Sequence, residues 1–109
     1  MSLIIYTDGA SRGNPGRGGY GAILQWGDKK KELSGGYKMT TNNRMELLAV
    51  IKALEALSRD GLEIQIYTDS KYVVDSVEKG WVFGWEKKAF AGKKNHDLWM
   101  RYLKLHRKH

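Results

Sequence analysis

The sequence has no cysteine and only one proline among its 109 residues. Without cysteine the chain can form neither disulfides nor thiolate metal sites. Its apolar runs are a few residues long, whereas a helix that crosses a bilayer needs roughly 20 apolar residues. The first residues also lack the basic region and cleavage site of a secretory signal. We therefore expect a cytoplasmic protein that does not enter a membrane.

The composition is that of an ordinary globular protein. Hydrophobic residues make up 41% of the chain and charged residues 28%, which excludes the disordered and low-complexity classes. A chain of this length can build one small hydrophobic core. We expect residues 1–109 to form a single domain.

Positive charge is concentrated at the end of the chain. Residues 86–109 contain eight lysines and arginines but two acidic residues, within a net charge of +7. The aromatic residues in and beside this segment are Trp81, Phe83, Trp85, Phe90 and Trp99. Basic side chains interleaved with aromatic rings are typical of nucleic-acid binding. The alternative is a solvated basic face above tryptophans that belong to the core.

Local patterns predict three strands in the first part of the chain. Residues 3–8 are mostly β-branched or aromatic and stop at Gly9, which is typical of a buried strand. Residues 19–26 and 31–37 predict two further strands, joined by a hairpin turn at Gly27-Asp28. Together these segments predict an antiparallel meander.

A long helix is expected next. Residues 40–43 offer N-cap side chains, and the residues that follow, to about Arg59, contain neither glycine nor proline. Residues 62–68 predict a fourth strand. The order strand–helix–strand implies a crossover, so we predict an α/β fold in which a parallel strand joins the antiparallel meander and helices flank the mixed sheet.

The last part of the chain predicts two more helices. Asp69 or Ser70 is expected to cap a helix that runs to Lys79, and Asn95 or Asp97 is expected to begin a final amphipathic helix. The three histidines show no metal-ligand pattern, so we interpret them as solvent-facing: His96, His106 and His109.

One tetrapeptide occurs twice. Ile-Tyr-Thr-Asp spans residues 5–8 and again residues 66–69, each time at the end of a predicted strand. If these strands pair in parallel, Asp8 and Asp69 lie at one edge of the sheet, where α/β sheets place their ligands. The alternative is local, with Asp8 as a turn residue and Asp69 as a helix cap.

Glu46 favours the functional interpretation. It lies with the apolar residues of the predicted long helix, where burial of a carboxylate is costly without compensation. The helix N-terminus could compensate part of this cost. Three carboxylates without a basic partner would otherwise take up protons, so Asp8, Glu46 and Asp69 more plausibly hold a hard divalent cation, Mg²⁺ or Mn²⁺.

Several motifs together resemble type 1 ribonuclease H in their order and spacing, from Leu3 to about Leu103. They are Tyr6–Gly9, Gly13–Gly16, Gly18–Gly21, Thr40–Glu46 and Thr68–Ser70. The resemblance implies a ribonuclease H-like sheet and metal-dependent cleavage of the RNA strand of RNA·DNA hybrids, with one or two ions per site. It also implies that Asp8, Glu46 and Asp69 are metal ligands and catalytic residues.

The resemblance further implies a set of substrate contacts. These are Gly9, Ser11, Asn14, Thr41, Asn42 and Asn43 near the carboxylates, and Trp81, Trp85, Lys87 and Lys88 in an aromatic and basic protrusion at residues 81–94. Thr41 would belong to a phosphate pocket. Glycines would let backbone amides approach a sugar–phosphate chain closely. Asn42 and Asn43 could instead cap the long helix.

Family members continue with another strand, a loop that carries a histidine, and a helix that carries a fourth carboxylate, which this sequence does not contain. We therefore expect an open edge at residues 62–68 that forms a homodimer or binds a complementing polypeptide. We expect weak activity from the isolated chain. The alternative function is an inactive hybrid-binding fragment that needs a complementing segment.

Overall fold

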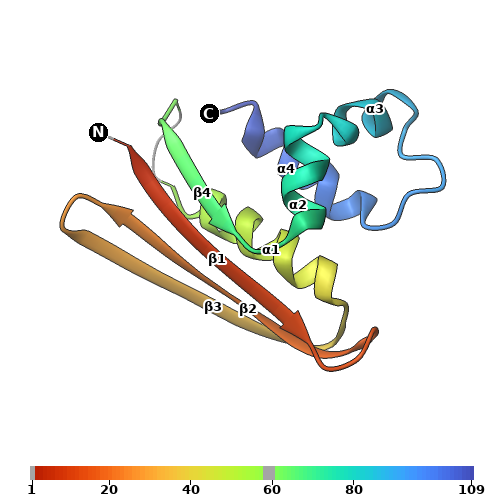
Figure 1. The fold of residues 1–109 in the computed structure, drawn as a ribbon, viewed down its shortest axis with the longest axis horizontal. Coiled ribbons are helices and arrows are strands. Elements are labelled where there is room, and N and C mark those ends of the chain that lie inside the picture. The colour runs from red at the N-terminus through yellow and green to blue at the C-terminus, as the bar shows by residue number, and fades with distance from the viewer. Residues whose placement is uncertain (1, 58–60) are drawn as a thin grey trace.

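The protein is described here by a computed structural model, which places residues 2–57 and 61–109. The chain order of its elements is shown in Figure 1: β1 (Leu3–Ser11), β2 (Gly16–Trp26), β3 (Lys29–Thr40), α1 (Asn42–Glu55), β4 (Ile64–Thr68), α2 (Lys71–Glu78), α3 (Trp81–Lys87) and α4 (His96–His106). No helix in the described part of the chain is both long and apolar enough to traverse a bilayer.

The four strands form one mixed sheet in the order β3-β2-β1-β4. β2 pairs antiparallel with both β1 and β3, and β4 pairs in parallel with β1. This topology confirms the predicted meander and the predicted parallel crossover. The register pairs Tyr6 with Tyr67 and Thr7 with Thr68, so the two copies of the repeated tetrapeptide lie side by side.

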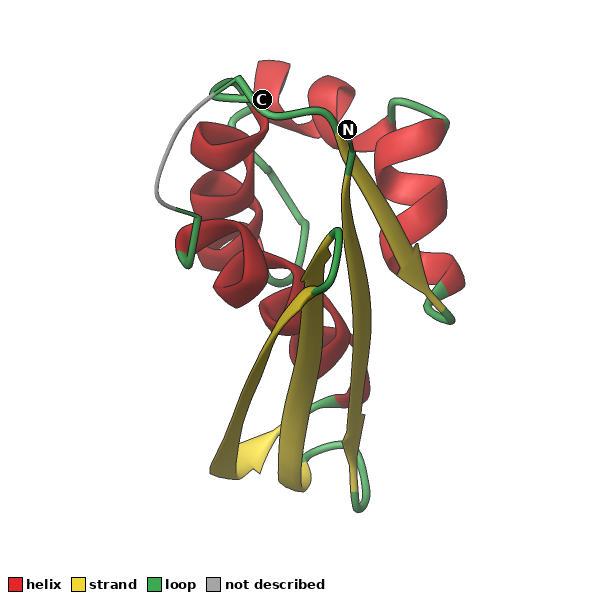
Figure 2. Ribbon diagram, turned by 90° about the vertical axis from the view of Figure 1, so that its left-hand side faces the viewer, coloured by secondary structure: helices red, strands yellow, loops and turns green. Residues whose placement is uncertain are grey.

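Helix α1 covers the inner face of the sheet. It lies behind β1 and β4 in Figure 1, and it packs against β1 and β2. The strand residues that face it include Ile5 and Leu24, and the helix contributes Leu47 and Ile51, all of them buried. Figure 2 shows that the end of the sheet formed by β1, β2 and their loop extends beyond the helices. The residues that precede Glu46 therefore lie close to an accessible sheet end.

Several boundaries differ from those predicted. β1 continues past Gly9 to Ser11, because Gly9 to Ser11 pair with Tyr20 to Gly18 of β2. β2 and β3 are likewise longer than predicted, and β4 begins two residues later, at Ile64. α1 ends at Glu55 rather than near Arg59, since a C-cap at Ala56 bonds its N–H to carbonyls of the last turn. Arg59 itself lies outside the described residues.

Residues 81–94, the predicted aromatic and basic protrusion, contain a helix that the sequence patterns did not predict. Their first half forms α3, which buries Val82 completely. Trp85 lies edge-on to Trp99, with ring centroids 6.1 Å apart, and Trp99 is fully buried. The aromatic spacing that suggested nucleic-acid contacts therefore also serves packing, and Trp81 is the exposed tryptophan of this helix.

A polar network holds the start of α4 against α1 and α2. Arg44 of α1 donates to both carboxylate oxygens of Asp97, at 3.0 and 2.8 Å, and to the Asn95 side chain at 3.1 Å. Asn95 and Trp99 in turn donate to the Tyr72 hydroxyl. The hydrogen bond from Arg44 lowers the pKa of the Asp97 carboxyl to about 2. The loop before α4 is thus tied to the N-terminal end of α1.

Candidate active site

Gly9 and Glu46 meet where α1 crosses β1. A Cβ atom added to Gly9 would lie 2.4 Å from the backbone carbon of Met45 and 2.6 Å from the backbone nitrogen of Glu46. Only glycine permits so close an approach of helix and strand. The Gly9 N–H consequently donates to Glu46 Oε1 at 2.8 Å.

The second oxygen of Glu46 is bound from β4. The Thr68 hydroxyl donates to Glu46 Oε2 at 3.2 Å, and the Ser70 N–H donates to the same hydroxyl at 3.1 Å. Ser70 also accepts from the Val73 N–H as the N-cap of α2. Glu46, which is 6% exposed, is therefore a compensated buried carboxylate, as the costs of burial require.

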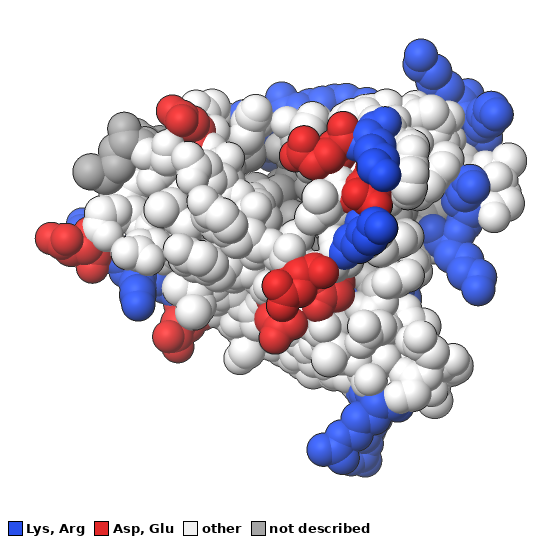
Figure 3. Space-filling view, viewed as in Figure 1, with Lys and Arg blue, Asp and Glu red and all other residues white. Residues whose placement is uncertain are grey.

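Asp8 lies within β1, three residues before the strand ends at Ser11, and Asp69 directly follows β4. Both aspartates lie near the Glu46 carboxylate, and both are exposed. In Figure 3, acidic side chains gather over the ends of these two strands. Burial is the main cause of a raised pKa at Glu46, and the negative charges of Asp8 and Asp69 raise it further, whereas the hydrogen bonds from Gly9 and Thr68 lower it. The local interpretation of Asp69 as a helix cap is wrong, because Ser70 caps α2.

The donors near this end of the sheet suit a hard divalent cation, since all three are carboxylates and the negative charges of Asp8 and Asp69 act on Glu46. Within residues 2–57 and 61–109, however, no three acidic or histidine side chains converge on one point as metal ligands would. The structure brings Glu46 into the field of both aspartates.

The loop between β1 and β2 is bonded to the start of α1. The Ser11 N–H donates to the Asn42 side chain at 2.9 Å, and the Asn42 N–H donates to the Asn14 side chain at 3.0 Å. Thr41 is the N-cap of α1 and accepts from the Arg44 N–H. The predicted cap role of Asn42 and Asn43 is therefore wrong, and both lie exposed in the first turn of the helix.

The basic segment lies apart from the carboxylates, on α3 and the loop after it, where basic side chains gather at the right of Figure 3. Lys87 and Lys88 are exposed. The ammonium groups of Lys79 and Lys93 each lie 5.3 Å from a tryptophan ring centroid, that of Trp81 and Trp85 respectively. These contacts are within the range of cation–π attraction.

Sequence reasoning did not single out Thr68 as a functional residue. The available signal was the repeated tetrapeptide, whose third residue faces the core in both strands. The tetrapeptide itself does not distinguish Thr7 from Thr68. One partner of Thr68, the Ser70 N–H, is local, whereas the other, Glu46, is brought to it by the position of α1.

Comparisons with known proteins place this geometry in a family. The family model described as RNase H matches residues 1–109. The chain is 52% identical over 112 residues to a ribonuclease H of Syntrophus aciditrophicus (strain SB), covering 98% of this chain and 64% of that protein. It is 53% identical over 112 residues to a ribonuclease H of Trichodesmium erythraeum (strain IMS101), covering 98% and 71%. The chain thus spans about two thirds of the length of these relatives.

Solved structures give the same result. LC11-RNase H1 in complex with an RNA/DNA hybrid superposes with a TM-score of 0.64 at 33% identity, over 72% of this chain and 62% of that chain. The N-terminal RNase H domain of a Mycobacterium tuberculosis protein, fused to maltose-binding protein, superposes with a TM-score of 0.78 at 27% identity, over 98% and 75%. These similarities confirm the predicted fold class.

Asp8→Asn is expected to leave the fold intact. Because the pKa of Glu46 is raised in the folded chain, its ionisation lowers the free energy of unfolding as the pH rises above about 4.5. Removing the Asp8 charge makes this decrease smaller. In thermal melts in EDTA at about pH 5 and about pH 7.5, the free energy of unfolding of Asp8→Asn should lie no more than about 0.5 kcal/mol below that of the unchanged chain. Stabilisation by added Mg²⁺ should disappear. A melt far below that of the unchanged chain would identify Asp8 as a structural residue.

Proposed function

The chain belongs to the ribonuclease H family, and on that premise we propose that it hydrolyses the RNA strand of RNA·DNA hybrids with the help of divalent metal ions. The observation that carries the proposal is the buried Glu46 carboxylate, which accepts hydrogen bonds from Gly9 of β1 and Thr68 of β4 and lies near Asp8 and Asp69. A carboxylate so costly to bury has a use that the fold alone does not explain. A solved relative was crystallised with an RNA/DNA hybrid, which supports the choice of substrate.

We propose that the carboxylates of Asp8, Glu46 and Asp69 would hold the divalent metal ions. Mg²⁺ suits these oxygen donors, and Mn²⁺ is an alternative. One or two divalent ions bound there would activate a water molecule and stabilise the departing 3′ oxygen. The protein's own contribution is to compensate charge and to hold the reacting groups in place.

Substrate positioning falls to the residues around the β1–β2 loop. The hydrogen bonds among Ser11, Asn14 and Asn42 hold this loop against α1, so that its exposed residues can approach the sugar–phosphate chain. Gly9 is buried and its N–H binds Glu46, so its predicted contact with substrate would be indirect. Asn43 and Thr41 lie at the same helix end. We propose that these groups read the 2′-hydroxyls and phosphates of the RNA strand across a wide minor groove.

The basic segment would contact the DNA strand of the hybrid. Lys87 and Lys88 are exposed on α3 and in the turn that ends it, and Trp81 offers an exposed ring at the start of the same helix. Trp85 is half-buried, so its contribution would be to support the segment as well as to contact nucleic acid. Lysines bind phosphates without reading sequence. This segment would therefore supply affinity rather than cleavage specificity.

The activity can be measured directly. The chain should cleave an end-labelled RNA·DNA hybrid in Mg²⁺ or Mn²⁺, weakly when alone, while Asp8→Asn should lose at least 100-fold, on the order expected when a metal ligand of a catalytic site is removed. Duplex DNA serves as the control substrate. Tight hybrid binding without cleavage in either metal would favour the alternative, an inactive hybrid-binding fragment.

Hybrid binding should depend strongly on salt. Replacing Lys87, Lys88, Lys93 and Lys94 by Ala should lower the slope of log affinity against log salt, by about 0.9 for each phosphate of a B-form duplex that the variant no longer neutralises. A matched control replaces Lys29, Lys30, Lys31 and Lys104, which are also exposed, by Ala. Equal slopes for the two quadruple variants would place the binding surface elsewhere.

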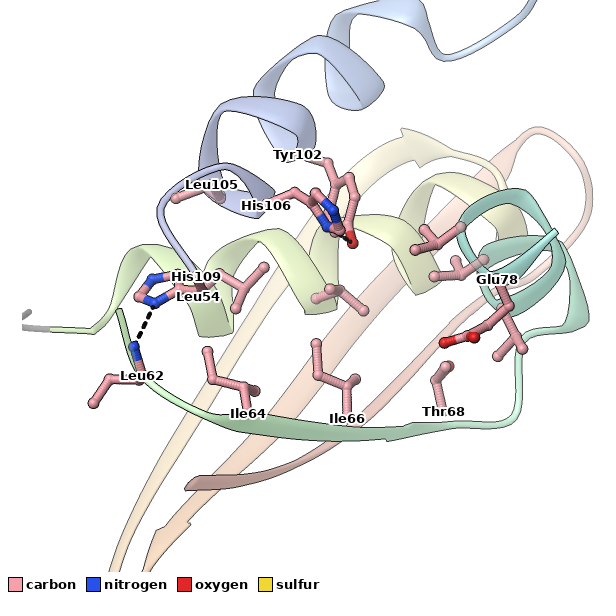
Figure 4. Close-up of a pocket in the computed structure, with 14 residues that line it drawn as sticks. Leu54, Leu62, Ile64, Ile66, Thr68, Glu78, Tyr102, Leu105, His106 and His109 are labelled. Carbon is pink, nitrogen blue, oxygen red and sulfur yellow. Dashed lines mark hydrogen bonds between the residues drawn. The ribbon is translucent and has the colours of Figure 1, made fainter. Parts of the chain in front are cut away.

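The outer edge of β4 suggests a protein partner. Within the described residues β4 pairs with β1 alone, and an apolar groove of about 330 Å³ lies above it. Figure 4 shows Ile64 and Ile66 pointing into this groove from β4, opposite Tyr102 and Leu105 of α4. His109 also lines the groove and accepts from the Leu62 N–H at 3.3 Å, so its interpretation as solvent-facing is wrong.

We propose that an extended segment of another polypeptide pairs with β4 and fills this groove with alternate apolar side chains, as in strand addition to a sheet edge. Sedimentation at micromolar concentration should show a complex with a peptide that spans the last strand and helix of family members. A peptide of scrambled sequence is the control. Self-association without peptide would identify a second copy as the partner, and a monomer indifferent to both peptides would contradict the proposal.

A further inference from the structure

Two threonines occupy equivalent positions in the sheet but have different partners. Thr7 and Thr68 are register partners in β1 and β4, and each precedes an aspartate. The hydroxyl of Thr7 is buried and has no hydrogen-bond partner within the described part of the chain. The hydroxyl of Thr68 has two partners, Glu46 and the Ser70 N–H. Within the described residues, the threonine hydroxyl is therefore hydrogen-bonded on β4 and has no partner on β1.

The hydrogen bonds of Thr68 leave Glu46 as the acceptor for its hydroxyl proton. A hydroxyl carries one proton and can accept on its lone pairs. Because the Ser70 N–H donates to Thr68 Oγ1 at 3.1 Å, the hydroxyl proton points to Glu46 Oε2 at 3.2 Å. Ser70 is itself held as the N-cap of α2. The orientation of the donor is therefore set by the start of a helix.

Thr68 also determines how the Glu46 carboxylate can turn. The terminal torsion of a glutamate is broad, so one hydrogen bond does not fix the plane of its carboxylate. Gly9 holds Oε1 from β1, and Thr68 holds Oε2 from β4. With both oxygens held, each keeps a further lone pair in a fixed direction for a cation. Without Thr68 the carboxylate would be free to rotate about the bond to Gly9.

We propose that Thr68 is a positioning residue that fixes the Glu46 carboxylate for divalent-metal binding, whereas Thr7 has no such role. The inference rests on the proposed metal-dependent function. Hydrogen-bond partners of metal ligands typically contribute 10- to 100-fold to metal affinity. The geometry predicts an effect of this size at Thr68 and none at Thr7.

The test compares the same substitution at the two positions. Thr68→Val should weaken Mg²⁺ and Mn²⁺ binding, measured by calorimetry on the otherwise unchanged chain, by about 10-fold or more. Thr68→Ser, which keeps the hydroxyl, should restore most of the affinity. Thr7→Val is the matched control and should bind the ions as tightly as the unchanged chain. It should be at least as stable, because it removes a buried hydroxyl without a partner.

Hybrid cleavage separates this proposal from the proposed function. The positioning role of Thr68 is supported if Thr68→Val loses affinity for the metal ions and has a lower kcat with an unchanged KM for the hybrid. If Thr68→Val does not fold, the same result is expected for Thr68→Ala. If Thr68→Val binds the ions as tightly as the unchanged chain, or if Thr7→Val loses as much affinity as Thr68→Val, the positioning role of Thr68 is overturned. Hybrid cleavage by the unchanged chain would still uphold the proposed function in that case. If the unchanged chain binds the ions but does not cleave the hybrid, the proposed hydrolytic function is wrong. The metal-binding isotherms of the variants then test the role of Thr68 by themselves. Absence of metal binding in the unchanged chain overturns both.

Discussion

The contact between the Gly9 N–H and the Glu46 carboxylate is the constraint on which the candidate site depends. It requires α1 to cross β1 at a separation that only a glycine allows. That separation brings an acidic side chain under the sheet, next to the ends of β1 and β4. Any side chain at Gly9 would force the helix away and remove Glu46 from both of its donors.

The Glu46 carboxylate is subject to opposing effects on its pKa. Burial and two nearby aspartates raise the pKa of Glu46, while two hydrogen bonds lower it, and burial is the largest of these effects. A fold selected for stability alone would place an apolar residue at this position. Under the proposed function, a divalent cation would neutralise this accumulated negative charge and so offset the cost of burying Glu46.

A second network connects the site to the basic segment. Arg44 lies two residues before Glu46 and binds Asp97 and Asn95 at the start of α4. Through Tyr72 and Trp99 the same network reaches α2 and the rings beneath α3. Of the three carboxylates only Glu46 lies on a helix, and this network connects its helix, α1, with α2 and α4 and, through the Trp85–Trp99 contact, with α3, which carries Lys87.

The sequence alone predicts the order of the elements other than α3, the parallel pairing and three candidate carboxylates, because strand and helix periodicities and the repeated tetrapeptide are local signals. It predicts element ends poorly: nothing local shows that Gly9 continues β1 or that residues 81–87 form a helix. Only the tertiary structure decides that Thr68 rather than Thr7 binds Glu46. The physical reason is that a hydrogen bond between residues distant in sequence depends on where a helix crosses a sheet, which is set by the packing of the whole core.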